Sequence, residues 1–391
     1  MIPRILAEYA AAIFTKYPVV TVTGPRQSGK TTLARATFAD KPYANLENPV
    51  TRQFAQEDPL AFLNQYPEGA VIDEIQRVPD LLSYIQVIVD ERGKNSLFVL
   101  TGSQQFELMR GISQSLAGRT ALLKLLPFSI PELSAGFSLD IDEMLFKGFY
   151  PRIYAQDLAP AQAYGDYFET YVERDLRQLV NVKDLSVFQR FVRLCAGRCG
   201  QLLNLNGLAN DTGISQSTAR EWMTVLEASY IVFLLQPFHA NIGKRLIKSP
   251  KMYFYDVGLA SWLCGIEEEK QVATHPLRGS LFENMVIMEV LKYRYNHGKR
   301  NNLYFYRDSN GNEIDLIYTK GNDMLPIEIK SGQTITPAYF SGLKKISALF
   351  PDQLPWPGFL IYGGETEQAR QDIKVLRIFS LPEHLDEIER Q

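Results

Sequence analysis

A glycine-rich segment near the N-terminus contains the residue types that bind the phosphates of a nucleotide. It matches the pattern G-x-x-x-x-G-K-[ST] at every fixed position and consists, with one flanking residue, of Gly24, Pro25, Arg26, Gln27, Ser28, Gly29, Lys30, Thr31 and Thr32. The two glycines allow backbone angles that turn successive N–H groups toward an anion. Lys30 can reach the β- and γ-phosphates, and the Thr31 hydroxyl can ligate Mg²⁺. The segment therefore predicts binding of a nucleoside triphosphate together with Mg²⁺.

The sequence on both sides of this segment supports the same prediction. An apolar, β-branched run at residues 19–23 precedes it, and residues 32–36 can open a helix. A helix that begins directly after the loop places the positive end of its dipole at the anion site. A glycine turn that arose by chance would not need a strand before it or a helix after it. We therefore expect a strand, a phosphate-binding loop and a helix in this order.

Two carboxylates stand at the end of a second apolar run. Residues 70–72 lead directly into Asp73 and Glu74. A continuous apolar run is typical of a strand that is buried on both faces of a parallel sheet. We expect Asp73 to lie near Mg²⁺, usually through water, and Glu74 to orient or deprotonate the attacking water.

Two further polar positions could act on the phosphates. The apolar run 96–100 ends shortly before Ser103 and Gln104, which could contact the γ-phosphate or the attacking water; a polar turn is the alternative. Arg119 precedes another apolar run at 120–125. Its guanidinium could reach a phosphate in its own chain or in a neighbour, whereas a simple surface arginine is the alternative.

Together these positions resemble those of AAA-type P-loop ATPases, and most of all a prokaryotic group in which the ATPase is joined to a C-terminal domain of unknown function. The segments that carry the resemblance are 24–31, 71–76, 100–104 and 116–119. The resemblance implies an ATP-binding, Mg²⁺-dependent ATP hydrolase with an α/β P-loop NTPase fold and a parallel sheet. It also implies the ATPase roles given above to Glu74, Ser103 and Arg119. Ser103 and Gln104 depart from the commonest sensor residues, Asn and Thr.

The middle of the chain predicts helices and then a helix-turn-helix. Over residues 136–195 we expect a helical lid or connector, in which an aromatic stripe serves for packing: Tyr164, Tyr167, Phe168 and Tyr171. A short helix at 205–211 and a second helix capped by Ser215 follow, and then a strand at 231–235 and a basic wing at 244–251. This order predicts a winged helix-turn-helix over 196–270.

The winged-helix region carries more positive charge than the rest of the chain. Residues 183–251 contain nine Lys or Arg against four Asp or Glu, although the whole chain has a formal charge of −3. Gln216, Ser217 and Arg220 are expected on the exposed face of the second helix, where they could contact bases or phosphates. Such a surface favours DNA, but winged helices also dock proteins, and both partners stay open.

Near the C-terminus, carboxylates and a lysine occur with strand spacing. Asp315 lies in an alternating run, and Glu328 and Lys330 share one face of the next expected strand. Two carboxylates can hold Mg²⁺, and a lysine can help to activate water. Glu283 points to the packed face of an upstream helix, where a buried carboxylate needs a partner.

The order of these residues, a glutamate on a helix, then an aspartate, then Glu-x-Lys on a strand, resembles the PD-(D/E)xK nuclease superfamily. This resemblance implies a restriction-endonuclease-like α/β domain. The resemblance implies metal binding by Asp315 and Glu328, with Lys330 as the motif lysine and Glu283 as the helix glutamate. Glu313-Ile314 replaces a proline that often precedes the aspartate. Whether the domain cleaves DNA stays open, because related domains can keep the fold without the activity.

Composition limits the alternatives. With 391 residues the chain has room for two or three domains, and its three cysteines are too few for a disulfide framework. We find no signal peptide and no apolar stretch long enough to span a membrane, and therefore expect a cytoplasmic protein without a membrane partner.

These expectations combine into one domain order and two functions. The expected domains are an AAA-type ATP-binding domain (1–135), a helical lid (136–195), a winged helix (196–270) and a restriction-endonuclease-like domain (271–391). The first function is an ATP-driven switch on DNA, contacted through residues 205–251 and the C-terminal domain. The second is an ATPase that regulates a protein partner and has a non-catalytic C-terminal binding domain. A homo-oligomer is compatible with both.

Overall fold

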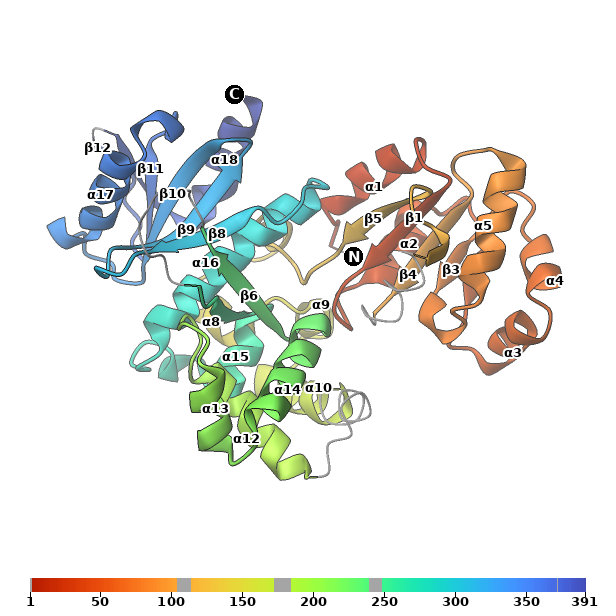
Figure 1. Ribbon diagram of the computed structural model, residues 1–391, viewed down its shortest axis with the longest axis horizontal. Coiled ribbons are helices and arrows are strands. Elements are labelled where there is room, and N and C mark those ends of the chain that lie inside the picture. Colours follow the sequence, from red (N-terminus) through yellow and green to blue (C-terminus); the bar gives the residue numbers. More distant parts are fainter. Residues whose placement is uncertain (1, 104–113, 172–183, 239–247, 371) are drawn as a thin grey trace.

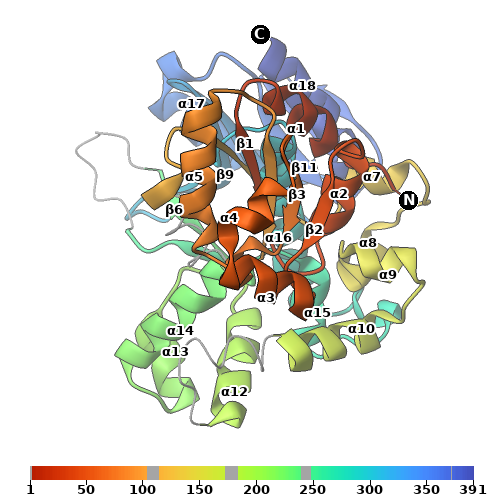
Figure 2. The same cartoon turned by 90° about the vertical axis from the view of Figure 1, so that its right-hand side faces the viewer.

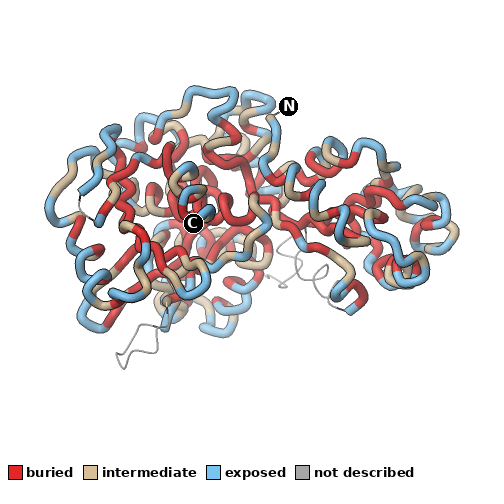
Figure 3. The backbone as a smooth tube through the Cα atoms, turned by 90° about the horizontal axis from the view of Figure 1, so that it is seen from above, coloured by how far each residue is buried: buried red, intermediate tan, exposed pale blue. Residues whose placement is uncertain are grey.

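The computed structural model of the protein describes residues 2–103, 114–171, 184–238, 248–370 and 372–391. Figure 1 shows an N-terminal domain (red and orange) at one end and a C-terminal sheet (blue) at the other, with helices (green) below. Buried segments run through the interior of both parts (Figure 3). Within the described residues, no helix combines the length and the apolar character needed to cross a membrane.

The N-terminal domain is built on a five-stranded parallel sheet. The strand order is β2-β3-β4-β1-β5, and every neighbouring pair is parallel. The strands are β1 (Val19–Thr23), β2 (Tyr43–Asn45), β3 (Val71–Asp73), β4 (Phe98–Gly102) and β5 (Thr120–Lys124). The expected α/β P-loop fold with a parallel sheet is thus confirmed for this domain.

Helices cover both faces of this sheet, which explains why the inner strands β1, β3 and β4 are buried along their whole length. Val20 and Val22 pack with one set of helices, whereas Val19 belongs to the core on the opposite face. The first face is covered by α1 (Leu6–Phe14) and α2 (Lys30–Thr37). The second is covered by α3 (Pro49–Glu57), α4 (Pro59–Asn64), the 3₁₀ turn η1 (Ile75–Arg77) and α5 (Leu81–Arg92).

The middle of the chain is helical, and its aromatic stripe is core. Tyr164, Tyr167, Phe168 and Tyr171 are each at most 5% exposed, as the packing interpretation predicts. Figure 2 shows α12, α13 and α14 at the lower edge of the molecule. The helices are α7 (Ile130–Ser134), α8 (Ile141–Lys147), α9 (Pro151–Ala155), α10 (Pro160–Tyr167), α12 (Leu185–Ala196), α13 (Leu205–Thr212), α14 (Gln216–Ala228) and α15 (Val257–Leu263), followed by η3 (Glu269–Gln271).

The start of α14 follows the local sequence signals. The Ser215 side chain accepts a hydrogen bond from the Thr218 N–H, so the predicted N-cap is confirmed. Gln216, Ser217 and Arg220 are exposed on this helix. Residues 239–247, which include the first half of the expected basic wing at 244–251, lie outside the described residues. The winged helix therefore stays a prediction.

The C-terminal sheet has eight strands in the order β12-β13-β11-β10-β9-β8-β6-β7. Its strands are β6 (Val232–Pro237), β7 (Lys251–Phe254), β8 (Leu303–Arg307), β9 (Glu313–Lys320), β10 (Asp323–Lys330), β11 (Gly358–Tyr362), β12 (Gln368–Arg370) and β13 (Ile373–Arg377). Around it lie α16 (Arg278–Asn296), α17 (Ser341–Leu349) and α18 (Leu381–Arg390), with the 3₁₀ turns η4 (Pro337–Phe340), η5 (Pro351–Gln353) and η6 (Ile378–Ser380).

The expected boundary between residues 270 and 271 runs across shared structure. Strand β6 pairs in parallel with β8, with Gln236 opposite Tyr304, so the hairpin β6–β7 extends the C-terminal sheet. One hydrophobic core also extends from Leu126 to Ile388. The described residues from Leu126 to the strand β7 and the C-terminal sheet therefore pack as one body.

Helix α16 forms the centre of this body. Its residues are buried from Leu281 to Asn296, with the exception of Glu283, so the helix is buried on all sides over this length. It contacts β10, α8 and α15, and it reaches the N-terminal domain at α1 and β5. One helix thus joins the two ends of the molecule seen in Figure 1.

Candidate functional site

The glycine-rich segment forms a loop between β1 and α2, as its sequence predicts. Gly24 has φ 151°, and a Cβ atom there would lie 2.1 Å from the Leu125 carbonyl oxygen. Gly29 has φ 90° and caps the start of α2. Because both positions need a positive φ, side chains other than hydrogen would strain the loop. The backbone N–H groups at the start of α2 then face the site where phosphates bind in P-loop proteins.

Lys30 is buried within this loop. Its Nζ donates hydrogen bonds to the carbonyl oxygens of Gly24 (3.1 Å) and Pro25 (2.7 Å). Burial lowers the pKa of Lys30 to about 8, although the Glu74 and Asp73 carboxylates act in the opposite direction. A triphosphate would offer this ammonium stronger acceptors than the neutral carbonyls, because ionised acceptors form the stronger hydrogen bonds.

Asp73 is the polar centre of the nucleotide site. Thr31 Oγ1 donates to its Oδ2 at 2.9 Å, Tyr43 OH donates to the same oxygen at 2.7 Å, and Thr101 Oγ1 donates to Oδ1. Asp73 is only 3% exposed. A hydroxyl and a carboxylate in direct contact are oxygen ligands of the kind that Mg²⁺ accepts, so Thr31 and Asp73 fit a magnesium ion.

Glu74 and Ser103 are also brought together. Ser103 Oγ donates to Glu74 Oε2 at 3.3 Å, and Gln76 donates to the same oxygen. Glu74 has a left-handed backbone (φ 58°), and its N–H donates to Thr101 Oγ1 at 3.2 Å. These contacts fix the Glu74 carboxylate beside the loop. Gln104, the other sensor candidate, lies outside the described residues.

Arg119 lies apart from the other predicted ATPase residues. Thr120 pairs with Val19, at the beginning of β1, whereas the phosphate loop follows Thr23 at the opposite end of that strand. The Arg119 guanidinium forms two hydrogen bonds with Asp90, at 2.6 and 2.8 Å. The structure thus does not bring Arg119 to the loop of its own chain, and a role toward a neighbouring chain stays a prediction.

Two arginines contribute to the nucleotide site without a recognisable sequence signal. A cavity of about 500 Å³ lies over the loop, and Arg152 from α9 lines it opposite Lys30 and Thr31. Arg4 donates from Nη1 to the Ser28 carbonyl (2.7 Å) and pairs with the buried Glu132 (3.0 Å). Both arginines come from elements distant in sequence, so no local pattern could have identified them.

The four residues of the expected C-terminal site form one cluster. Lys330 Nζ lies 3.1 Å from Asp315 Oδ2 and 2.6 Å from Glu328 Oε1. Asp315 Oδ2 also accepts from the Ile329 N–H at 2.8 Å. Glu283 reaches the same cluster from α16. Strands β9 and β10 and helix α16 therefore position the residues that the motif predicts.

A second lysine, Lys251 on β7, lies within this cluster. The sequence places it at the end of an exposed basic wing, but the structure corrects this: Lys251 is 3% exposed. Its Nζ lies 3.1 Å from Glu283 Oε1 and 3.9 Å from Asp315 Oδ1, and it also pairs with Glu313. The sequence around a lysine in a strand does not indicate whether the side chain is buried or exposed. Here the lysine is buried because carboxylates from other elements pair with it.

Burial controls the charges of this carboxylate–lysine cluster. It raises the pKa of Glu328 to about 7, with a further contribution from Asp315, while Lys330 opposes the shift. Burial and Asp315 likewise raise the pKa of Glu283. Burial alone would lower the pKa of Lys251, but the surrounding carboxylates raise it above its usual value. The carboxylates therefore depend on the lysines for their ionisation.

The carboxylate–lysine cluster could hold a metal ion only with additional ligands from outside the cluster. Among the residues that the structure describes, no group of three or more His, Cys, Asp or Glu side chains is arranged to hold a metal ion. Glu328 Oε2 is buried and has no hydrogen-bond partner, so one carboxylate oxygen could accept a cation. Asp315 and Glu328 could then hold Mg²⁺ if waters or phosphate oxygens supply the other ligands.

Comparison with known proteins assigns the N-terminal domain. Residues 16–134 match a family described as AAA domain; residues 138–270 and 278–381 match two domains of unknown function, DUF8612 and DUF4143. Among solved structures, the Walker-type ATPase PABY2304 of Pyrococcus abyssi has a TM-score of 0.45 at 15% identity, covering 67% of this chain and 96% of that one. Domain III of the replication initiation protein DnaA from Thermotoga maritima has a TM-score of 0.25 at 13% identity, covering 56% of this chain and 88% of that one.

Two curated mycobacterial proteins are similar over most of the chain. They carry the names "Uncharacterized protein Rv2008c" (Mycobacterium tuberculosis) and "Uncharacterized protein Mb2031c" (Mycobacterium bovis), and each is 33% identical over 352 residues, which cover 89% of this chain and 77% of the relative. The chain therefore belongs to the family of these mycobacterial proteins, and its N-terminal domain is an AAA-type P-loop ATPase domain.

Proposed function

We propose that the protein hydrolyses ATP with Mg²⁺ and that this ATPase switches the state of the C-terminal carboxylate–lysine cluster on DNA. One observation carries the ATPase part: Thr31 and Asp73 are in direct contact beside the loop that holds Lys30. Phosphate-binding lysine, hydroxyl and carboxylate thus occupy one site, as phosphoryl transfer requires.

Each residue has a defined task in this proposal. Lys30 and the loop N–H groups bind the β- and γ-phosphates, and Thr31 and Asp73 hold Mg²⁺, which neutralises phosphate charge. Glu74 orients and deprotonates the attacking water. Ser103 positions the Glu74 carboxylate through the hydrogen bond described above. Arg119 acts on the phosphates of a neighbouring chain, which makes a homo-oligomer part of the proposal.

The decisive ATPase test compares Lys30→Ala with Lys94→Ala. Lys94 is an exposed lysine of the same domain and serves as the matched control. We expect Lys30→Ala to abolish ATP binding or turnover and Lys94→Ala to retain both, measured as nucleotide affinity and phosphate release. Full ATPase activity in Lys30→Ala would refute the proposal.

For the C-terminal domain we propose a restriction-endonuclease-like fold and metal-dependent DNA cleavage. The supporting observation is the convergence of Asp315, Glu328 and Lys330 from adjacent strands. Asp315 and Glu328 would hold Mg²⁺, and Lys330 would orient the attacking water and offset phosphate charge. The exposed Gln216, Ser217 and Arg220 of a winged helix would contact DNA.

The alternative is an ATPase that regulates a protein partner while its C-terminal domain only binds. The two lysines favour it, because Lys251 and Lys330 already pair with the carboxylates of the cluster. DNA cutting in Mg²⁺ or Mn²⁺ should be lost in both Asp315→Ala and Lys330→Ala. It should be kept in the control variant Asp323→Asn, which lies on β10 as Lys330 does. Cutting that persists in both variants excludes those residues; wild-type protein that never cuts supports the alternative.

A further inference from the structure

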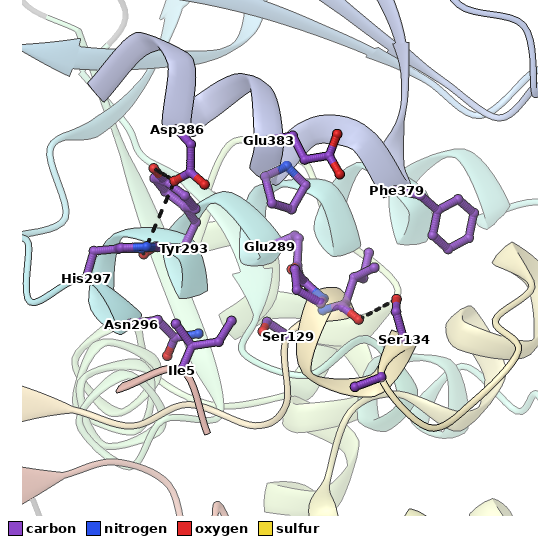
Figure 4. Close-up of a pocket in the computed structure, with 14 residues that line it drawn as sticks. Ile5, Ser129, Ser134, Glu289, Tyr293, Asn296, His297, Phe379, Glu383 and Asp386 are labelled. Atoms are coloured by element: carbon purple, nitrogen blue, oxygen red, sulfur yellow. Dashed lines mark hydrogen bonds and ion pairs between the residues drawn. The ribbon is translucent and has the colours of Figure 1, made fainter. Parts of the chain in front are cut away.

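A third cavity lies apart from the nucleotide site and the carboxylate–lysine cluster. It has a volume of about 540 Å³ and is enclosed by the N-terminal segment at Ile5, by α7, and by helices α16 and α18 (Figure 4). A volume of this size is typical of sites for small organic ligands. Neither proposed activity uses this cavity.

The cavity wall carries negative charge. Glu289 lines it from α16, and Glu383 and Asp386 line it from α18. Among the described residues that line it there is no lysine or arginine, and the basic side chain is His297, which lies 4.0 Å from Asp386. Three carboxylates against one histidine disfavour an anionic ligand, because like charges repel at short distance.

Glu289 points to a missing partner in the cavity. The residue is only 2% exposed, and its Oε1 accepts a hydrogen bond from the Ile130 N–H at 2.8 Å. Its Oε2 accepts no hydrogen bond and forms only a long ion pair with the Lys292 ammonium, at 3.8 Å. Lys292 instead lies over the Phe149 ring, 3.6 Å from the ring centre. A buried carboxylate oxygen without a hydrogen bond is costly, so a donor in the cavity would stabilise it.

The remaining wall is suited to an amphipathic cation. Tyr293 stands one helical turn after Glu289, so the two side chains share the cavity face of α16. Tyr293 OH donates to Asp386 Oδ1 at 2.6 Å, which orients this carboxylate at the half-exposed mouth of the cavity. Phe379 and Ile130 supply apolar wall. Aromatic rings attract cations as well as apolar groups.

We propose that this cavity binds a small organic cation, an amine or guanidinium with an apolar body, whose charged head donates to Glu289. Asp386 and Glu383 attract the cation at the entrance, and the apolar wall holds its body. A neutral ligand could donate a hydrogen bond to Glu289 but would bring no positive charge to it. An anion would be repelled. The described residues that line this cavity include none from the nucleotide site or the carboxylate–lysine cluster.

The test measures binding of three amine probes, phenethylamine, agmatine and spermidine, to the full chain by calorimetry. 2-Phenylethanol and phenylacetate serve as the neutral and anionic counterparts of phenethylamine. We expect at least one amine to bind the wild-type protein, and neither counterpart to bind. Glu289→Gln keeps the hydrogen bond from Ile130 but removes the charge, and we expect about tenfold weaker binding, since a hydrogen bond to a charged group is worth about that much.

Glu387→Gln is the control. Glu387 lies on α18, as Glu383 and Asp386 do, but it pairs with Lys374 and does not line the cavity. It should bind the amine like the wild type. Failure of all three amines to bind, or equal binding by wild type and Glu289→Gln, overturns the proposal. If Glu289→Gln does not fold, the double variant Glu383→Gln/Asp386→Asn decides: weaker binding supports the site, and unchanged binding overturns it.

Discussion

Replacing the buried Lys251 by methionine should destabilise the C-terminal body strongly. The ammonium contacts Glu283 and Glu313 and lies 3.9 Å from Asp315, so its removal leaves three carboxylates without this cation. Removing one partner of a buried ion pair costs about 3–5 kcal/mol, and we expect a loss of this size. Lys374→Met is the control, because Lys374 forms a more exposed pair with Glu387 and should lose only about 0–1 kcal/mol.

The loss should depend on pH in a defined direction. The pKa of Glu328 is raised from 4.5 to about 7, so the stability that its protonation provides is present at low pH and is lost as the pH rises through about 7. The pKa of Glu283 is raised as well. Glu328 can take up a proton at about pH 6 but not at about pH 8. We therefore expect Lys251→Met to lose more stability at the higher pH.

Urea denaturation of the full chain, followed by circular dichroism at both pH values, measures this effect. Adding Glu283→Gln to Lys251→Met removes one of the unpaired charges, and the double variant should recover part of the loss. The reasoning is refuted if Lys251→Met is as stable as the wild type at the higher pH. It is also refuted if the loss is the same with and without Glu283→Gln.

Three further predictions concern the other sites. Glu74→Gln should keep ATP affinity but lower phosphate release by about 10²-fold or more, since it removes the proposed base; unchanged turnover would exclude that role. Amine binding should tighten between about pH 6 and pH 8, because burial raises the pKa of Glu289 to about 7, with Lys292 on the same helix opposing and Glu132 on α7 adding to the shift. Calorimetry that shows constant affinity would contradict this. Arg4→Gln should lower both the thermal midpoint and ATP affinity, because it leaves the buried Glu132 unpaired and frees the Ser28 carbonyl of the loop; scanning calorimetry and nucleotide titration measure the two effects.

The nucleotide site was predictable because its signals are local. Loop glycines, the strand before them and the helix after them form one continuous segment, and Asp73 directly ends the next buried strand. Parallel strands end at the same edge of a sheet, so contact between Thr31 and Asp73 follows from the pattern. The N-cap Ser215 is predictable for the same reason: it depends only on its neighbours.

Other features depend on contacts between distant segments. The apolar run in β6 predicts a strand, but nothing in it indicates that Gln236 pairs with Tyr304 of β8. Lys251 ends a segment that has the composition of a basic wing. It is buried because Glu283 and Asp315 approach it from other elements. Arg4 contacts Glu132 across more than a hundred residues. Sequence periodicity records which face of an element is apolar, but it does not record which element will cover that face.

Helix α16 connects the inferences about the C-terminal body. It carries Glu283 of the carboxylate–lysine cluster and, about two and three turns further on, Glu289 and Tyr293 of the acidic cavity. Glu289 accepts from Ile130 at the start of α7, and α7 also contains Glu132, which pairs with Arg4. Because α16 is buried on all sides and close-packed interiors do not deform freely, a shift of this helix would alter the cluster and the cavity together. A cation bound at Glu289 is therefore placed to influence Glu283 through a single rigid element.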